Sequence, residues 1–376
     1  MTDDAHLAHG LSGDHAPADW PALTEAEVDG LLRRYPALGP AQRIAWHSPR
    51  PLSAGCLVDT GQASVFVKRH HHSVRSAATL AEEHRFIAHL RRNHAAVPEV
   101  LADRHGRTAI DDGDWVYEVH RRARGVDLHR ETISWQPLTE RAHAVAAGRM
   151  LAMLHDAAEG HDAPQRATHI LVARSELIRA ADPVATLEAQ LPERPGLADY
   201  LRDRDWQHAL RETIAPWHKR AQPRLAQQPR LWTHGDWHVS NLYWSGSDPD
   251  ARVTDVLDFG LSAANFALFD LATAIERNAI AWLELGPHAG RIDIAHALIE
   301  GYRQHRPLDA AQLDLLADLL PLVHVDFALS EVEYYHAITR SPGNADAAYG
   351  TFLQGHAAWF RTPAGEALLQ SIRQTG

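Results

Sequence analysis

The chain has 376 residues, 45% of them hydrophobic and 23% charged, which is enough for two packed lobes of a soluble globular protein. Its formal net charge of −11 argues against a general nucleic-acid binder, because phosphate contacts need clustered Lys and Arg side chains. The single cysteine, Cys56, excludes an internal disulfide framework, and no apolar run approaches the roughly 20 residues of a membrane helix. The N-terminal residues lack the basic start and apolar stretch of a signal peptide. We therefore expect a cytoplasmic protein that binds neither nucleic acid nor membranes, with its oligomeric state left open.

The first third of the chain changes character near residue 40. Residues 1–40 are rich in Ala, Asp, His, Gly and Pro and carry one short helical pattern at Leu23–Arg34, so we predict an N-terminal extension there. From Arg43 to His70, short apolar segments alternate with Ser-Pro and Thr-Gly turns, which is typical of an antiparallel β-meander. A helix is predicted at Val74–Asn93, and two further strands flank the D-D-G-D turn at 111–114.

Beyond residue 139 the apolar periodicity is mostly helical. A β-rich first part and an α-rich second part predict an α+β protein of two lobes, residues 41–122 and 123–376, that meet near Arg121–Gly125. The helices predicted in the second lobe are Thr139–Ala158, Pro183–Gln190, Trp206–His218, Phe269–Leu285, Asp293–His305, Asp309–Leu320 and Leu322–Ile338.

Two neighbouring segments carry the polar residues with the clearest chemistry. Residues 231–241 read L-W-T-H-G-D-W-H-V-S-N, and residues 253–260 read V-T-D-V-L-D-F-G. The sequence between them reads as strand, turn and strand, so a hairpin is predicted to bring Asp258 beside Asn241. Their side-chain oxygens suit Mg²⁺ that is also held by substrate phosphates. Asp236 is then left to accept or align a hydroxyl proton, which is the division of roles in phosphoryl transfer.

These residues resemble the aminoglycoside phosphotransferase and choline kinase family, whose catalytic loop reads H-G-D-x-x-x-x-N and is followed by an Asp at a strand end. The resemblance implies a bilobal protein-kinase-like fold: a small N-lobe with an antiparallel sheet that binds the nucleotide, and a larger, mostly helical C-lobe with the catalytic loop and the acceptor site. It also implies that Asp236 is the catalytic base, that His234 orients the loop, and that Asn241 and Asp258 bind magnesium.

A kinase of this type also needs a strand lysine for the nucleotide phosphates and a helix glutamate that holds it. Lys68 ends the apolar strand S-V-F-V-K-R, and Glu83 lies on the next helix in a pattern similar to the family's E-x-x-x-L-x-x-L. The segment 115–122, which contains Glu118 and His120, resembles the hinge strand whose backbone pairs with a purine, and the family favours ATP. No G-x-G-x-x-G precedes Lys68, so the nucleotide loop is placed at 47–55.

Further matches to the family are the helix M-L-A-M-L-H at 150–155 and the D-L-A element near Asp270. The resemblance implies that Asp270 accepts hydrogen bonds from the backbone of the catalytic loop. The consecutive histidines 70–72 are predicted to form a solvent-exposed turn rather than a metal site. On the last predicted helix, Asp326 and Glu333 share a face and are either a solvated acidic surface or a wall that attracts an amine-bearing acceptor.

The expected function is therefore the ATP- and Mg²⁺-dependent transfer of a γ-phosphate to a hydroxyl of a small molecule, of the amino alcohol, aminoglycoside or amino sugar class. Three alternatives stay open: a homoserine-kinase-like metabolic enzyme, a stress-response-type Ser/Thr protein kinase, and a nucleotide-binding pseudokinase. The short segment between Phe259 and Asp270 leaves little room for an activation segment, which disfavours the protein kinase. Retention of Lys68 and Asp236 disfavours a scaffold, which needs no base.

Overall fold

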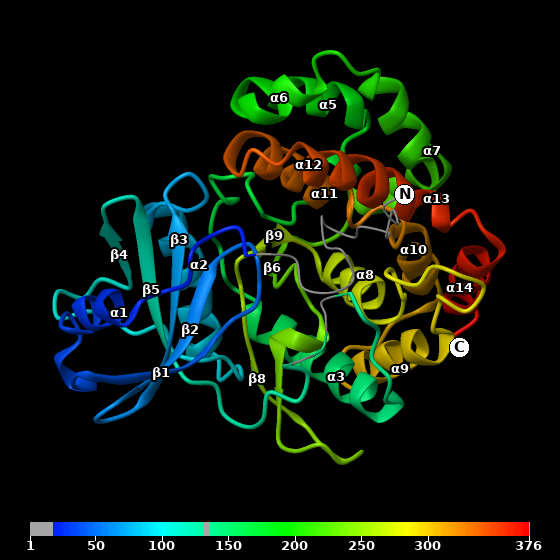
Figure 1. Cartoon of the computed structure of the whole chain (residues 1–376). Helices are drawn as coiled ribbons and strands as arrows, with labels where there is room; N and C mark the ends of the chain where they lie inside the picture. The colour runs from blue at the N-terminus through cyan, green and yellow to red at the C-terminus, as the bar shows by residue number, and fades with distance from the viewer. Residues whose placement is uncertain (1–17, 131, 133–134, 376) are drawn as a thin grey trace, which may run out of the picture.

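The computed structural model describes residues 18–375 except 131, 133 and 134. It has a five-stranded antiparallel sheet at one side and a larger helical region at the other (Figure 1), so the predicted α+β architecture of two lobes is confirmed. The strands of the sheet lie in the order β1-β2-β3-β5-β4. Their bounds are β1 Ala41–His47, β2 Ala54–Thr60, β3 Ser64–His71, β4 Ala109–Asp112 and β5 Trp115–Arg121.

The outer face of the sheet is covered by α1 (Glu25–Leu32), as Figure 1 shows. Thr24 caps this helix by accepting a hydrogen bond from the backbone N–H of Glu27. The described part of the segment predicted as an extension is therefore built into the small lobe, because α1 packs its apolar face into that lobe's core. The buried residues shared by α1 and the sheet include Val28, Leu31, Leu32, Cys56, Val58, Val65 and Val67.

The helix α2 (Ala77–Arg92) joins the two lobes. It begins slightly later than predicted because Ser76 accepts a hydrogen bond from the backbone N–H of Thr79 and so caps it. Phe86 on its buried face packs against Trp232 and Phe259 of the C-lobe, with ring centroids 5.4 and 5.9 Å away. Packing against both lobes fixes the position of α2 beside the sheet.

The helical lobe agrees with most of the predicted helices and differs most clearly in two. The helix α7 runs on through Pro216 to Leu225, because Trp217, Ala221 and Leu225 continue one buried face, and α8 stops at Asn278, earlier than predicted. None of the helices among the described residues is both long and apolar enough to span a membrane. The main helices are α3 Arg141–Ala158, α5 Pro183–Gln190, α6 Pro195–Leu201, α7 Trp206–Leu225, α8 Ala267–Asn278, α9 Ile292–Arg303, α10 Ala310–Leu319, α11 Val325–Glu333 and α14 Pro363–Arg373, and the shorter ones are α4 Glu176–Arg179, α12 Pro342–Ala347 and α13 His356–Trp359.

Two glycines let α3 and α9 cross in direct backbone contact. A Cβ on Gly148 would lie 2.0 Å from the carbonyl oxygen of Leu298, and a Cβ on Gly301 would lie 1.9 Å from that of Val145. Any larger residue would therefore push the helices apart. The close crossing matters for the candidate site, because His155 of α3 and Tyr302 of α9 are linked by a hydrogen bond and His155 lies beside Asp270.

Two short antiparallel sheets lie between the lobes in Figure 1. One pairs β6 (Leu231–Thr233) with β9 (Ala263–Asn265), and the other pairs β7 (Leu242–Trp244) with β8 (Val253–Val256). The second is the hairpin predicted from the sequence, and its closure places residue 257 directly beside residue 241. Three tryptophans around these strands are buried: Trp232, Trp237 and Trp244.

Candidate active site

The loop between β6 and the short helical turn Val239–Asn241 has a fixed backbone path. Gly235 has φ +78°, and a Cβ there would lie 2.7 Å from the carbonyl oxygen of Leu261, so only glycine fits. His234 is fully buried, and its Nε2 lies 2.7 Å from the carbonyl oxygen of Leu257. Its Nδ1 accepts the backbone N–H of Asp236 at 3.1 Å, so Nε2 carries the proton and donates to Leu257. His234 therefore holds the loop in place, the role that the family resemblance implied.

Asp270 supports this loop from below, as predicted. Its two carboxylate oxygens accept the backbone N–H groups of His234 and Gly235, both at 2.8 Å. His155 on α3 lies 3.1 Å from the same carboxylate, and its other ring nitrogen lies 2.8 Å from the hydroxyl of Tyr302 on α9. Burial alone would raise the pKa of Asp270, but the hydrogen bond and charge of His155, with the loop N–H groups, hold it below the usual value.

Substituting Asp270 by Asn should destabilise the protein at pH 7, because an amide cannot accept both loop N–H groups. Each buried donor left unsatisfied costs about 1–3 kcal/mol. The pKa of Asp270 in the folded protein is lower than the ordinary value of 3.8, so its carboxylate contributes fully to the free energy of unfolding when the pH is above 3.8. That contribution is lost as the pH falls through the pKa in the folded protein. Urea unfolding at pH 7 and pH 3 should show the variant weaker at pH 7 and less sensitive to acid than the wild type. Asp250→Asn on the exposed β7–β8 turn is the control, and equal unfolding free energies for all three proteins would contradict this role.

The proposed metal ligands are brought together by the β7–β8 hairpin. The backbone N–H of Leu257 donates to the carbonyl oxygen of Asn241 at 2.8 Å, which sets Asp258 next to Asn241. The amide NH₂ of Asn241 donates to the backbone oxygen and the carboxylate of Asp236, at 2.9 and 3.1 Å. Its amide oxygen is therefore left for a cation. This donor set of one carboxylate and one amide oxygen fits Mg²⁺, which prefers hard oxygen ligands.

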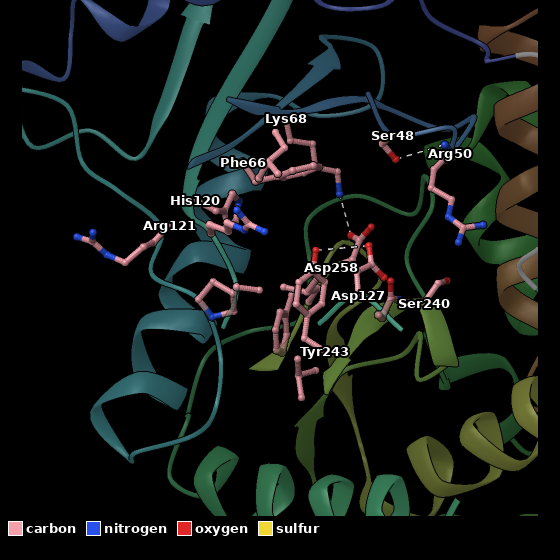
Figure 2. A pocket seen from close by; sticks show the side chains of 18 of the residues that line it. Ser48, Arg50, Phe66, Lys68, His120, Arg121, Asp127, Ser240, Tyr243 and Asp258 are labelled. Atoms are coloured by element: carbon pink, nitrogen blue, oxygen red, sulfur yellow. Dashed lines mark hydrogen bonds and ion pairs between the residues drawn. The ribbon is translucent and has the colours of Figure 1, made fainter. Parts of the chain in front are cut away.

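Asp258 has an unusual backbone and a strong partner. Its φ of +55° lies in the left-handed region, where Asp is better tolerated than most residues. Its carboxylate pairs with the Nζ of Lys68 at 2.8 Å, and Figure 2 shows the two side chains pointing toward each other across the cleft. Burial lowers the pKa of Lys68, but Asp258 and the more distant Glu118 and Glu83 outweigh it and hold that pKa above the usual value. Burial likewise raises the pKa of Asp258, and Lys68 brings it back below the usual value.

Glu83, predicted to hold Lys68, is engaged elsewhere. The side chain of Arg166 is fully buried. Its guanidinium lies 3.9 Å from the carboxylate of Glu83 and 3.1 Å from that of Glu82. A buried guanidinium needs anionic partners, so it takes both helix carboxylates, while Lys68 pairs with Asp258. Glu83 and Lys68 still line the same cavity, so the structure brings them near each other without the direct ion pair.

The larger of two adjoining cavities lies between the sheet and the β7–β8 hairpin and has about 1030 Å³ of space, part of it open to solvent. Apolar side chains from both lobes line its walls, as expected for a site that holds a flat ring. The β1–β2 turn, which lies within the segment 47–55 predicted as the nucleotide loop, closes one side. The lining residues include Ser48, Arg50, Phe66, Ile87, Asp127, Tyr243 and Val256, several of which Figure 2 labels.

Glu118 and His120 also line this cavity, but through side chains. The backbone of Glu118 lies between Lys68 of β3 and Ala109 of β4 in the ladder, so it cannot pair with a purine. Ala123, which follows the end of β5 and lines the cavity, lies outside the ladder and is the better position for such a pairing. The hinge contact is thus expected a few residues later than the sequence indicated, because the strand runs further than its polar residues suggest.

The expectation of a solvent-exposed turn at 70–72 is wrong for two of the three histidines. The strand β3 continues to His71, and its alternation turns His70 inward to lie 3.0 Å from the carboxylate of Glu118. His71 stacks on Trp20, with ring centroids 4.9 Å apart. His72 is partly exposed, in line with the prediction. Because all three residues are polar, the sequence alone did not reveal that His70 lies on the buried face of a strand.

The second cavity is lined at one end by Asp236, the residue predicted as the catalytic base. Asp236 pairs with Arg277 of α8 at 3.2 Å, and the guanidinium of Arg277 stacks on Trp135 at 3.6 Å. Burial raises the pKa of Asp236, but His238 and Arg277 outweigh it and hold it well below the usual range. Glu331 of α11 faces the same cavity, and burial raises its pKa well above the usual value.

The two carboxylates singled out on the last helix do not face this cavity. Asp326 and Glu333 pair with the fully buried guanidinium of Arg194, at 3.4 and 3.1 Å, and so fasten α6 to α11. They are neither a solvated surface nor an acceptor wall. Arg277 and Glu331 take the polar positions in the cavity, and the sequence analysis missed both. For Arg277 a signal existed, since it lies seven residues after Asp270 and so on the same helix face.

The two cavities share Arg50, Lys68, Asn241 and Asp258. Asp236 and Arg277 line only the second cavity, on the other side of this junction. A phosphoryl group held by Lys68 and Asp258 would therefore lie between the first cavity and Asp236.

Curated relatives in sequence include homoserine kinases. Homoserine kinase of Rhodopseudomonas palustris (strain TIE-1) is 28% identical over 235 residues, 61% of this chain and 62% of the relative. Homoserine kinase of Gluconobacter oxydans (strain 621H) is 26% identical over 185 residues, 49% of this chain and 51% of the relative. The chain thus spans about three fifths or less of the length of these curated relatives.

Solved structures share the fold at low identity. A microcompartment-associated aminopropanol kinase has a TM-score of 0.55 and 18% identity, with 92% of this chain and 100% of that chain covered. A spectinomycin phosphotransferase, in complex with ADP and spectinomycin, has a TM-score of 0.51 and 12% identity, with 93% and 98% covered. Such low identities show the fold alone. The family is shown by a different comparison. A protein-family sequence model described as "Phosphotransferase enzyme family" matches residues 53–308, more than half of the chain. The chain therefore belongs to the phosphotransferase enzyme family.

Proposed function

We propose that the protein transfers the γ-phosphate of ATP to a hydroxyl of a small molecule in a Mg²⁺-dependent reaction. The observation that carries this proposal is the junction of the two cavities, where Lys68, Asn241 and Asp258 line both and Asp236 faces only the second. Phosphoryl transfer depends on positioning and charge stabilisation around such a junction rather than on a covalent intermediate.

Each side chain has a separate task in this proposal. Mg²⁺, when bound by Asn241 and Asp258, neutralises charge on the phosphate oxygens. Lys68 leaves Asp258 for the phosphates, which present more negative charge than one carboxylate. Asp236, fixed by the amide of Asn241, accepts a hydrogen bond from the acceptor hydroxyl and takes its proton as the bond to phosphorus forms. Its low pKa makes alignment of the hydroxyl its larger contribution.

The acceptor cavity favours a small molecule that carries an amine. Glu331 is buried there with a raised pKa, and a bound ammonium group would favour its ionised form. Amino alcohols, aminoglycosides and amino sugars all have such a group. One structural neighbour, the aminopropanol kinase, is named for an acceptor of this kind.

A hydroxy amino acid of the homoserine type is the second candidate. A specific observation favours it: Arg277 lines the cavity beside Asp236, so that a carboxylate and an ammonium group could be held by Arg277 and Glu331 together. The curated relatives at 28% and 26% identity carry the name homoserine kinase. Both candidates use the same transfer chemistry and differ in whether the acceptor has an anionic group.

The experiment is an ADP-release screen of the purified chain with Mg-ATP against amino alcohols, aminoglycosides, amino sugars and hydroxy amino acids. We expect release above background with at least one amine-bearing acceptor and a phosphorylated product of matching mass. Release only with a protein substrate would favour the Ser/Thr kinase alternative, although β9 follows Phe259 within a few residues and leaves no long segment there. Nucleotide binding without release for any acceptor would favour the pseudokinase alternative.

Arg277→Gln is expected to raise the KM for carboxylate-bearing acceptors by about 10–100-fold, because a charge-assisted hydrogen bond contributes about 1.5–3 kcal/mol. The KM for an amino alcohol without a carboxylate should change much less. Steady-state kinetics with homoserine and aminopropanol on one preparation test this, with Arg303→Gln, on α9 and outside both cavities, as the control. Equal changes for both acceptors would mean that Arg277 acts on Asp236 rather than on a carboxylate.

A further inference from the structure

A cluster of imidazoles surrounds one buried carboxylate in the wall of the first cavity, which is proposed to hold the nucleotide and is called the nucleotide cavity below. Glu118 of β5 is 1% exposed, and its oxygens lie 2.7 Å from Nε2 of His84 on α2 and 2.9 Å from Nε2 of His120 on β5. The third neighbour is His70 of β3, at 3.0 Å. Three elements far apart in sequence thus aim ring nitrogens at a single carboxylate.

The composition of this cluster differs from an ordinary buried ion pair. Buried carboxylates usually pair with Arg or Lys, and among the described residues no guanidinium or ammonium group forms an ion pair with Glu118. Imidazole and carboxylate together are the ligands of Zn²⁺ and similar transition-metal ions, whereas Mg²⁺ prefers oxygen alone. The donor set therefore differs in kind from that of Asn241 and Asp258.

The distances fit a metal ion after a small adjustment. One ligand atom from each of His84, Glu118 and His120 can be chosen so that all three lie within 4.8 Å of one another. Tetrahedral zinc with bonds of about 2.0–2.1 Å holds its ligand atoms about 3.3 Å apart. The hydrogen-bond distances of 2.7 and 2.9 Å would need to open by only about 0.4–0.6 Å, which side-chain rotation can supply.

The surroundings of the cluster hold the ligands in orientation. The Nδ1 of His84 lies 2.8 Å from the hydroxyl of Thr108, which can fix the ring with its Nε2 toward the cluster. His84 and His120 both lie against Oε2 of Glu118. The second oxygen, Oε1, lies 3.0 Å from Nε2 of His70. Such outer partners are typical of protein metal sites, where they set the tautomer and the angle of each ligand.

We propose that His84, Glu118 and His120 form a binding site for a transition-metal ion such as Zn²⁺, separate from the magnesium site of the reaction. Glu118 and His120 line the nucleotide cavity, so the site lies in the wall of that cavity. Figure 2 shows His120 among the side chains of this wall, near Phe66. An ion bound there would tie α2, which carries Glu83 next to His84, to the strand that leads into the hinge.

The test uses Co²⁺ as a visible probe on the untagged full chain after removal of metal with a chelator. We expect an absorption band in the visible range that saturates at one ion per chain, is displaced by one equivalent of Zn²⁺, and survives an excess of Mg²⁺. His120→Gln, at a partly exposed position, should weaken Co²⁺ binding at least about 100-fold, more than the roughly 10–100-fold that loss of an outer partner costs. The control His105→Gln removes an exposed imidazole outside the cluster and should leave binding unchanged.

Two further variants keep the test decisive. Asp258→Asn should retain the band, and loss of the band there would place the ion at the magnesium site and overturn the proposal. His84→Ala should abolish it, with the melting temperature of the metal-free protein as a check on folding; if that variant does not fold, His120→Gln decides. Equal Co²⁺ affinity in wild type and His120→Gln, or no saturable band in the wild type, would also overturn it.

Discussion

Replacing Asp236 by alanine is expected to lower kcat by about 10²–10⁴-fold, the usual contribution of a positioned acid–base group. The carboxylate is held by the amide of Asn241 at 3.1 Å and by Arg277 at 3.2 Å, so a neutral side chain of smaller size removes both the base and the hydrogen bond that aligns the acceptor. Asp236 lines the second cavity, which is proposed to hold the acceptor, but not the first, which is proposed to hold the nucleotide. The Kd for Mg-nucleotide should therefore stay close to the wild-type value.

Turnover by ADP release and nucleotide binding by calorimetry, on one preparation, measure the two effects separately. Asp250→Ala, on the exposed turn of the same hairpin, is the matched control and should behave as wild type. The pKa of Asp236 lies below its ordinary value of 3.8, so the wild-type rate should show no loss from protonation of this group until the pH falls below about 4. A variant with near-normal turnover would remove Asp236 from the reaction, and a variant that no longer binds nucleotide would mean that it is structural.

Replacing Asp258 by asparagine is expected to lower kcat/KM by about 10²–10³-fold at millimolar Mg²⁺, because a bound metal ion contributes several kcal/mol to the transition state. Asparagine is the suitable substitution, since it tolerates the left-handed backbone at this position, where φ is +55°. It keeps one oxygen for the cation but removes the negative charge, and it removes the ionic partner of Lys68 as well.

The Mg²⁺ dependence identifies the cause of this loss. The concentration of Mg²⁺ for half-maximal rate should rise for Asp258→Asn and rise less for Asn241→Ala, because a neutral amide contributes less to a hard cation. Asn241→Ala should instead lower kcat, since its amide also holds Asp236. Lys68→Met should raise the nucleotide KM without moving the Mg²⁺ requirement. Unchanged Mg²⁺ dependence in both Asp258→Asn and Asn241→Ala would place the metal site elsewhere.

Local sequence determined the loop of Asp236 and the hairpin that follows it. Asp236, Asn241 and Asp258 fall within 23 residues, and turn chemistry between two short apolar runs was enough to predict that β7 and β8 pair. The contact of Asp270 with the loop backbone followed from the family pattern and was confirmed. Most of the longer helices were also predicted, because the apolar period of a long amphipathic helix is a local property, whereas α6 and α14 were not predicted.

Tertiary structure alone decided which charged groups became partners. Lys68 reaches Asp258 across 190 residues, Arg166 takes the carboxylate of Glu83, and Arg194 takes Asp326 and Glu333. The same holds for the histidines around Glu118 and for Arg277 beside Asp236. Periodicity tells which face of a helix or strand a residue occupies, but not which element will cover that face. A buried charge pairs with whatever opposite charge packing brings within reach, because leaving it unpaired costs several kcal/mol, and that choice is made only when distant segments meet.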